Sequence, residues 1–306
     1  MNTQICLGGL NKSESKKIFE YISKKFKNLS LIDVEKIDLN TTQVDIFILD
    51  FNGNFNDPLL KKILKVPNAI KVLLNRENRL SHFELYLKYK IDHILGINGE
   101  ELLTDLEQLI MSFLLKKNQY LDLLKKPDTT WTLDNPNNFR ENIKTNLSKI
   151  DFSSYFSEIP KIVELVLEET ITNALVHAPV DLKGKSVFKN IKEVKNSTFK
   201  KKQYLKIYTK KTNEFFMLSI MDQYGSLNPD IIKKYLAKGI DQIEYESKPS
   251  GAGLGLCLIF NYTTRFIIDI RPGISTTISL FFKNSKSSKK YFLHNKSFHI
   301  FKYELD

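Results

Sequence analysis

Three polar residues are spaced so that they could do chemistry together. Glu169, Asn173 and His177 lie four residues apart in the run IVELVLEETITNALVHA. On a helix, at about 100° per residue, this spacing puts all three on one flank of an apolar stripe. The stripe consists of Val163, Leu167, Thr170, Ile171 and Ala174. The asparagine oxygen suits Mg²⁺ beside phosphate oxygens, and the glutamate can accept a proton from water or a hydroxyl. Taken alone, the pattern favours a helix with a polar flank.

A second segment, FMLSIMDQYGSL, ends an apolar strand at Asp222 and turns at Gly225. An aspartate at a strand end can accept a hydrogen bond from an exocyclic amine such as that of adenine. Turn formation explains the same aspartate equally well.

A third segment is rich in glycine and leads into an apolar helix, so its backbone N–H groups can approach phosphates closely. It consists of Ser250, Gly251, Ala252, Gly253, Leu254, Gly255 and Leu256. The glycine order differs from the dinucleotide fingerprint G-x-G-x-x-G, and no strand directly precedes it.

In this order the three segments resemble the GHKL ATP-binding domain of histidine kinases and anti-sigma-factor serine kinases, over residues 139–283. The match E-T-I-T-N-A-L-V-H-A is closest to the anti-sigma-factor kinase version. The resemblance implies ATP and Mg²⁺ as cofactors, Glu169 as general base and Asn173 as magnesium ligand, with His177 beside the nucleotide. It also implies that Asp222 and Gly225 recognise adenine and that residues 250–256 close over the phosphates.

The adenine segment departs from the pattern of the family. The adenine segment usually reads D-x-G-x-G, whereas Tyr224 here takes the place of the first glycine. The polar stretch 226–250 would form a lid over the nucleotide, and Lys248 is our candidate phosphate contact there. Other lysines of the lid are Lys233, Lys234 and Lys238.

The elements that position these residues form a second domain, residues 139–283, expected to be a two-layer α/β sandwich of the Bergerat type. Apolar periodicity predicts its helices and strands, and Pro272-Gly273 predicts a hairpin turn between the last two strands. The helices are expected at 139–150, 159–177 and 253–262, and the strands at 204–209, 215–221, 266–271 and 276–282.

Residues 1–117 alternate short apolar runs with amphipathic segments, which is typical of a three-layer α/β domain of flavodoxin-like type. The strands are expected at 4–7, 30–34, 44–49, 70–74 and 92–95, and the helices at 13–26, 59–64, 81–89 and 100–115. The run VDIFILD, ending at Asp50, resembles a response-regulator receiver domain with Asp50 as phosphoacceptor. Because the acidic pair after the first strand and the lysine after the fifth are missing, we interpret this domain as a degenerate receiver used for interaction.

Residues 118–138 are predicted to be a linker, since residues 125–138 carry Pro127 and Pro136 and little apolar content. Residues 284–306 are predicted to be a C-terminal tail with enough aromatic content near its end to dock. The helix expected at 100–115 either packs on the first domain, which we favour, or dimerises, so a homodimer stays open.

Composition excludes several classes of protein. The 306 residues are 42% hydrophobic and contain no apolar run long enough to span a membrane, so we expect a cytoplasmic protein without a membrane role. The two cysteines, Cys6 and Cys257, lie far apart in apolar runs and suit core packing.

The net charge of +11 is unevenly spread along the chain. Residues 181–202 contain eight lysines and only two acidic residues. Few interleaved aromatic residues and no nucleic-acid motif occur there, which disfavours a nucleic-acid partner.

The sequence therefore predicts a bacterial signal-transduction protein that binds Mg·ATP and recognises a protein partner. The first hypothesis is a serine/threonine protein kinase of anti-sigma-factor type or an ATP-dependent partner switch. One alternative is an inactive nucleotide-binding or interaction adaptor. Another is a histidine-kinase-like domain that acts on a separate phosphotransfer protein, because no histidine lies between residues 116 and 159 where a dimerising hairpin would carry one.

Overall fold

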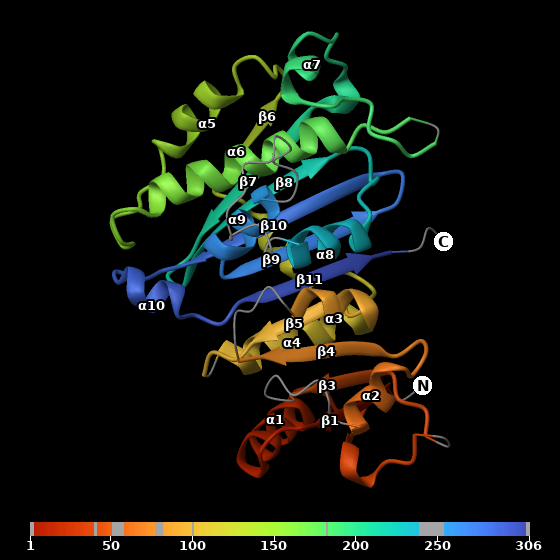
Figure 1. The fold of residues 1–306 in the computed structure, drawn as a ribbon. Coiled ribbons are helices and arrows are strands. Elements are labelled where there is room, and N and C mark those ends of the chain that lie inside the picture. The colour runs from red at the N-terminus through yellow and green to blue at the C-terminus, as the bar shows by residue number, and fades with distance from the viewer. Residues whose placement is uncertain are drawn as a thin grey trace. The chain divides into compact units, whose positions relative to one another are not determined.

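A computed structural model describes residues 3–39, 42–50, 58–76, 82–99, 101–181, 183–238 and 254–303 of the chain. It is a mixed α/β protein that divides into two compact units (Figure 1). The first unit comprises residues 1–117 and 295–299, and the second comprises 118–294 and 300–306. Among the described residues, no helix is both long enough and apolar enough to cross a bilayer.

The first unit alternates strands and helices in the predicted order. Its strands are β1 (Thr3–Gly8), β2 (Leu29–Asp33), β3 (Ile46–Leu49), β4 (Ile70–Asn75) and β5 (His93–Gly96). Its helices are α1 (Lys12–Lys25), the 3₁₀ turn η1 (Val34–Lys36), α2 (Pro58–Leu64), α3 (His82–Lys88) and α4 (Glu101–Leu114). The five strands pair in parallel in the order β2-β1-β3-β4-β5.

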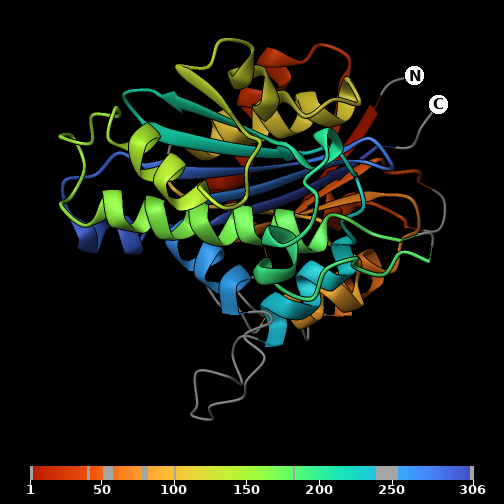
Figure 2. The same ribbon diagram turned by 90° about the horizontal axis from the view of Figure 1, so that it is seen from above.

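Helices cover both faces of this parallel sheet. α1 and α4 lie on one face, where the Tyr21 hydroxyl donates a 2.6 Å hydrogen bond to Glu107, and α2 and α3 lie on the other (Figure 2). A strand covered on both faces needs an unbroken apolar run, which explains why all four residues of β3 are buried. Because the five strands are parallel, their carboxyl ends lie at one edge of the sheet. Asp50 directly follows β3 and so lies at this edge.

Part of the predicted tail belongs to the first unit. Strand β11 (Ser297–Lys302) pairs antiparallel with β5, with Phe298 opposite Ile94. Asn295 precedes it and exchanges hydrogen bonds with Asn98 and Ile97. The aromatic content of the tail thus serves strand pairing and burial, and the segment is not a free extension.

The second unit is built on an antiparallel sheet. Its strands pair in the order β9-β10-β8-β7-β6. They are β6 (Thr129–Leu133), β7 (Leu205–Lys211), β8 (Phe215–Asp222), β9 (Arg265–Arg271) and β10 (Ser275–Lys283). The predicted hairpin turn between β9 and β10 is present, and Gly273 supplies the positive φ of 71° that it requires.

Helices α6 and α9 lie on one face of this sheet (Figures 1 and 2). The unit contains the helices α5 (Phe139–Leu147), α6 (Ile159–His177), α7 (Ile191–Lys195), α8 (Pro229–Lys238), α9 (Leu254–Tyr262) and α10 (Ser288–Phe292), and the 3₁₀ turns η2 (Gln119–Lys125) and η3 (Lys201–Gln203). The bounds of α6 match the prediction. Its buried face is broader than expected, since Leu175 and Val176 are buried while Ala174 is only half-buried.

Two predicted irregular segments are structured. Residues 118–138 contain η2 and β6, and β6 pairs with β7, with Trp131 opposite Ile207. The polar stretch after Asp222 contains α8, whose Ile232 and Leu236 are buried. Both segments are too polar overall for their short apolar faces to be recognised from the sequence.

Candidate functional site

The polar row of α6 is present as a hydrogen-bonded pair. Nδ2 of Asn173 donates to Oε1 of Glu169 at 3.2 Å, and both side chains are half-buried. Burial raises the pKa of Glu169, and the hydrogen bond from Asn173 opposes this shift. Because the bond uses the amide nitrogen of Asn173, its Oδ1 stays available to a cation. A carboxyl group with a raised pKa is suited to take up and release a proton.

Glu169 also touches the first turn of α9. A Cβ atom placed on Gly255 would lie 1.7 Å from Oε1 of Glu169, so no side chain fits there without displacing the glutamate. The absence of a Cβ atom at Gly255 lets the two helices meet at this point. The carboxylate of the first predicted segment and the glycine of the third are therefore in contact.

Asp222 ends β8 and is almost completely buried, with 6% of its surface exposed. Its Oδ1 accepts hydrogen bonds from the backbone N–H groups of Tyr224 at 2.8 Å and Gly225 at 3.3 Å. Burial raises the pKa of Asp222, and these hydrogen bonds oppose the rise. The aspartate thus shapes the turn that follows it, as the turn-forming alternative from the sequence requires, and Thr276 of β10 contributes further hydrogen bonds to the same carboxylate.

Gly225 is held against the β9–β10 turn. Its φ is +60°, and a Cβ atom there would lie 2.0 Å from the carbonyl oxygen of Arg271. Its own carbonyl accepts a hydrogen bond from Gly273 N–H at 3.3 Å. Both the backbone conformation and the lack of space therefore demand glycine at this position.

The loop after Asp222 is bonded to the end of α6. Oγ of Ser226 donates to the carbonyl oxygen of Ala178 at 2.6 Å. His177, the last residue of α6, is exposed, in keeping with a position at the edge of the unit. The α6 segment thus touches the glycine segment through Glu169 and the aspartate segment near its carboxyl end.

Several predicted residues lie outside the part of the chain that the structure describes. They are Lys248, Ser250, Gly251, Ala252 and Gly253, and the side chain of Leu254. Leu256 is described and buried at 9% exposure, so its side chain packs in the core of the unit. In α8, Lys233 is 1% exposed and pairs with Asp230 at 3.3 Å, which differs from the solvent-facing position expected of a lid lysine. Lys234 and Lys238 are exposed.

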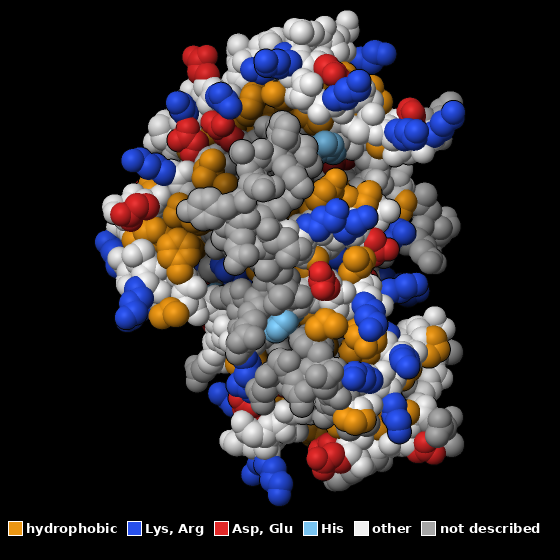
Figure 3. Space-filling view, in the orientation of Figure 1, with side chains coloured by type: hydrophobic (Ala, Val, Ile, Leu, Met, Phe, Trp, Pro, Cys, Tyr) orange, Lys and Arg blue, Asp and Glu red, His pale blue; other side chains and the backbone are white. Residues whose placement is uncertain are grey.

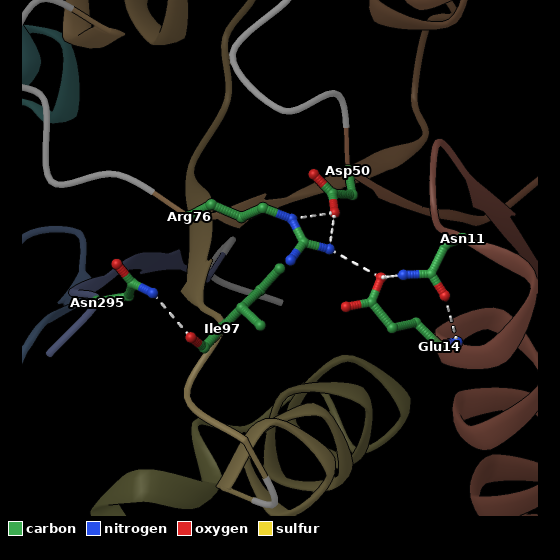
Figure 4. A network of polar contacts seen from close by, with 6 residues as sticks. All are labelled: Asn11, Glu14, Asp50, Arg76, Ile97 and Asn295. Carbon is green, nitrogen blue, oxygen red and sulfur yellow. Dashed lines mark hydrogen bonds and ion pairs between the residues drawn. The ribbon is translucent and has the colours of Figure 1, made fainter.

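The first unit holds a charge network that the sequence did not predict. Arg76, directly after β4, donates from Nε to Oδ2 of Asp50 at 2.7 Å and from Nη2 to Oε2 of Glu14 at 2.8 Å (Figure 4). Asp50 is 1% exposed, and Asn11 donates to the same oxygen of Glu14. A guanidinium therefore neutralises the predicted phosphoacceptor. Since neighbouring parallel strands end at one edge, the position of Arg76 after β4 was the available signal.

Among the described residues, no group of three or more His, Cys, Asp and Glu side chains is placed to hold a metal ion. A cavity of about 720 Å³ lies in the first unit at the carboxyl ends of β1 and β2, lined in part by Gly8, Lys12 and Asp33. None of the predicted site residues lines it.

Comparison with known proteins assigns no family. No protein-family model matches the chain, and no curated protein sequence matches it. Among solved structures, one described as two RcsB dimers bound to two parallel DNAs resembles it with a TM-score of 0.32 and 14% identity. That likeness covers 50% of this chain and 80% of the other, and at this TM-score it carries no argument about fold or function.

Proposed function

We propose that residues 139–283 form a GHKL-type domain that binds Mg·ATP, and that the protein acts in signal transduction on a partner protein. One observation carries the proposal: Glu169 touches Gly255, while the same helix is bonded at its end to the loop that follows Asp222. Three segments chosen from the sequence for nucleotide chemistry thus share one region of one unit.

Each group has a role in this proposal. Asp222 would accept a hydrogen bond from the adenine amino group, and Oδ1 of Asn173 would bind the magnesium ion. The first turn of α9 would place backbone N–H groups toward the phosphates. Magnesium would supply positive charge to the phosphate oxygens. Glu169 would accept the proton of a serine or threonine hydroxyl, and its raised pKa suits that task.

A second candidate is an adaptor that binds nucleotide, or only its partner, without turnover. The position of Glu169 favours it, because the carboxylate lies against the first turn of α9, where the first proposal places phosphates. If the protein is a kinase, the Glu169 side chain must move away from the first turn of α9 when nucleotide enters. A histidine-kinase-like activity on a separate phosphotransfer protein uses the same nucleotide site and differs only in its acceptor.

Calorimetric titration with ATP plus Mg²⁺, and with ADP, tests the site. We expect wild type to bind, and Asp222→Asn to lose about tenfold in affinity or more, because its amide nitrogen replaces an acceptor with a donor. Equal affinity for both proteins, or no binding by either, contradicts the proposal. Turnover of the γ-phosphate in wild type and its loss in Glu169→Ala, with binding retained, separates the kinase from the adaptor.

For the first unit, we propose an interaction module in which Asp50 is not phosphorylated. The Arg76 guanidinium already occupies its carboxylate. Incubation with a small-molecule phosphodonor such as acetyl phosphate, followed by intact-mass measurement, should show no added phosphoryl group. A phosphorylated fraction that disappears in Asp50→Asn would overturn this assignment.

A further inference from the structure

The lysine-rich segment of the second unit, residues 181–202, does not pair its lysines with its own two acidic residues. Seven of its eight lysine side chains are exposed and that of Lys195 is half-buried. Among the residues that the structure describes, none of the eight ammonium groups forms an ion pair. The eight are Lys183, Lys185, Lys189, Lys192, Lys195, Lys200, Lys201 and Lys202. Elsewhere in the same unit, lysines do pair: Lys144 with Glu164, and Lys210 with Asp128.

The two acids of this segment bind backbone groups instead. Oδ1 of Asp181 accepts from the N–H groups of Lys183 at 2.8 Å and Lys185 at 2.9 Å. Oε2 of Glu193 accepts from the N–H of Lys189 at 2.8 Å. The carboxylates thus fix the path of the chain, and within the described part of the chain the lysine ammonium groups have no carboxylate partner. Those of Lys195 and Lys202 lie over the rings of Phe139 and Tyr224.

The segment has a defined conformation over its length. Oγ of Ser186 donates to the Val176 carbonyl at 2.7 Å, Asn190 caps α7, and Val194 is fully buried. Near the end of the segment, the rings of Phe199 and Tyr204 stack with centroids 5.7 Å apart. A backbone that is already ordered loses little further conformational entropy when it binds a partner, so the entropy cost is limited to the lysine side chains.

This surface lies beside the candidate site. Nζ of Lys202 sits 5.2 Å from the centroid of the Tyr224 ring, and Gln223 donates to the Tyr204 carbonyl at 3.3 Å. Tyr224 and Gln223 belong to the loop after Asp222. In the space-filling view, blue side chains gather over α7 and the loop before it at the top of the molecule (Figure 3).

We infer that residues 183–202 are a docking surface for a segment of a partner protein rich in aspartate and glutamate. An acidic segment would supply the carboxylates that the surface lacks, and electrostatic complementarity would set both its specificity and its rate of association. The inference depends on the unpaired lysines and the ordered backbone of this segment, and it does not require that the protein binds nucleotide. A partner held there would also lie next to the loop that carries Asp222.

The same features disfavour nucleic acid. α7 has only five residues and is too short to present a recognition helix to a groove. Single-strand binding uses exposed aromatic rings as stacking platforms, but Phe199 is engaged with Tyr204 and Phe188 is half-buried. Nucleic acid therefore serves as the competing outcome in the test.

The test measures binding of a fluorescein-labelled poly-glutamate peptide to the full chain by anisotropy at low ionic strength. The variant carries Lys189→Glu, Lys192→Glu and Lys201→Glu. The matched control carries Lys161→Glu, Lys289→Glu and Lys290→Glu, which are exposed lysines of the same unit and change the net charge by the same amount. We expect the variant to lose about tenfold in affinity or more, and the control to stay within about twofold.

Two results would overturn the inference. Equal losses in the two triple variants would show attraction to net charge without a defined surface. Tighter binding of single- or double-stranded DNA than of poly-glutamate, at the same ionic strength, would assign the surface to nucleic acid. A variant that carries Lys189→Gln, Lys192→Gln and Lys201→Gln should lose an intermediate amount of affinity for poly-glutamate. Because it removes charge without reversing it, this variant separates the loss of charge from misfolding. Poly-glutamate is titrated without nucleotide and without Mg²⁺, so failure of the nucleotide proposal is recognised separately.

Discussion

At the scale of single residues, the contact between Gly255 and Glu169 links the first and third segments of the candidate site. An added methyl group at Gly255 would lie 1.7 Å from Oε1 of Glu169. Gly255→Ala should therefore force the half-buried Glu169 side chain to turn away, and lower the free energy of unfolding by about 1 kcal/mol. In the Glu169→Ala background the obstacle is gone, so the same substitution should be close to neutral. Urea unfolding of the four proteins of this double-mutant cycle provides the measurement, and equal costs in both backgrounds would contradict the contact.

The raised pKa of Glu169 predicts a dependence of stability on pH. Its folded-state pKa lies above the ordinary value of 4.5, so between the two values the folded state binds more protons than the unfolded state. The free energy of unfolding of wild type should therefore fall, relative to Glu169→Gln, as pH rises through this window. Asn173→Ala removes a hydrogen bond that lowers the pKa, and should extend the window to higher pH. A difference between wild type and Glu169→Gln that does not change with pH would refute the shift.

Arg76 neutralises a carboxylate that is 1% exposed. Arg76→Ala should cost about 1–3 kcal/mol, because the buried oxygen of Asp50 loses a charged donor that water replaces only in part. The double variant Asp50→Asn/Arg76→Ala should recover part of this loss, since the remaining side chain is neutral. Arg140→Ala is the control: its ion pair with Glu168 is on the surface, so we expect a change within about 0.5 kcal/mol. Similar losses for Arg76→Ala and Arg140→Ala would argue against a special role for Arg76.

At the scale of elements, β11 shows how a tail becomes part of a domain. Phe298 has no exposed surface, and its ring meets that of Phe83 edge-on with centroids 5.2 Å apart. Phe298→Ala should lower the free energy of unfolding of the first unit by about 3–5 kcal/mol. Leu293→Ala, at a side chain of the second unit that is 69% exposed, should change the free energy of unfolding of that unit by about 0.5 kcal/mol or less. Denaturant unfolding compares the two, and a small effect of Phe298→Ala would mean that β11 does not dock in solution.

The elements also differ in how well the sequence predicted them. Long periodic segments such as α6, and apolar runs such as β3 and β8, were predicted within a few residues because their pattern repeats within one local window. Strand β6 and helix α8 were missed. Residues of β6 alternate between exposed and half-buried until Leu133, so their strand character depends on pairing with β7.

At the scale of the whole molecule, the chain passes once more through the first unit before it ends in the second. Residues 295–299 belong to the first unit and residues 300–306 to the second. Deleting residues 295–306 should speed amide exchange in β5, above all at Gly96, whose N–H donates to Oγ of Ser297 at 3.0 Å. Exchange in β1 should change little. Deletion of residues 304–306 alone is the control, and unchanged exchange in β5 after the longer deletion would exclude this role for the tail.

The sequence by itself determined the local features of this protein: the mixed α/β class, the exact span of α6, the hairpin turn at Gly273 and the three segments that carry candidate chemistry. Each of these depends on periodicity or on backbone conformation over a few neighbouring residues. Only the tertiary structure decided that Arg76 meets Asp50, that Glu169 meets Gly255 and that β11 pairs with β5. Such contacts depend on packing and on strand order, which bring together residues far apart in the chain and leave no repeating pattern in either partner.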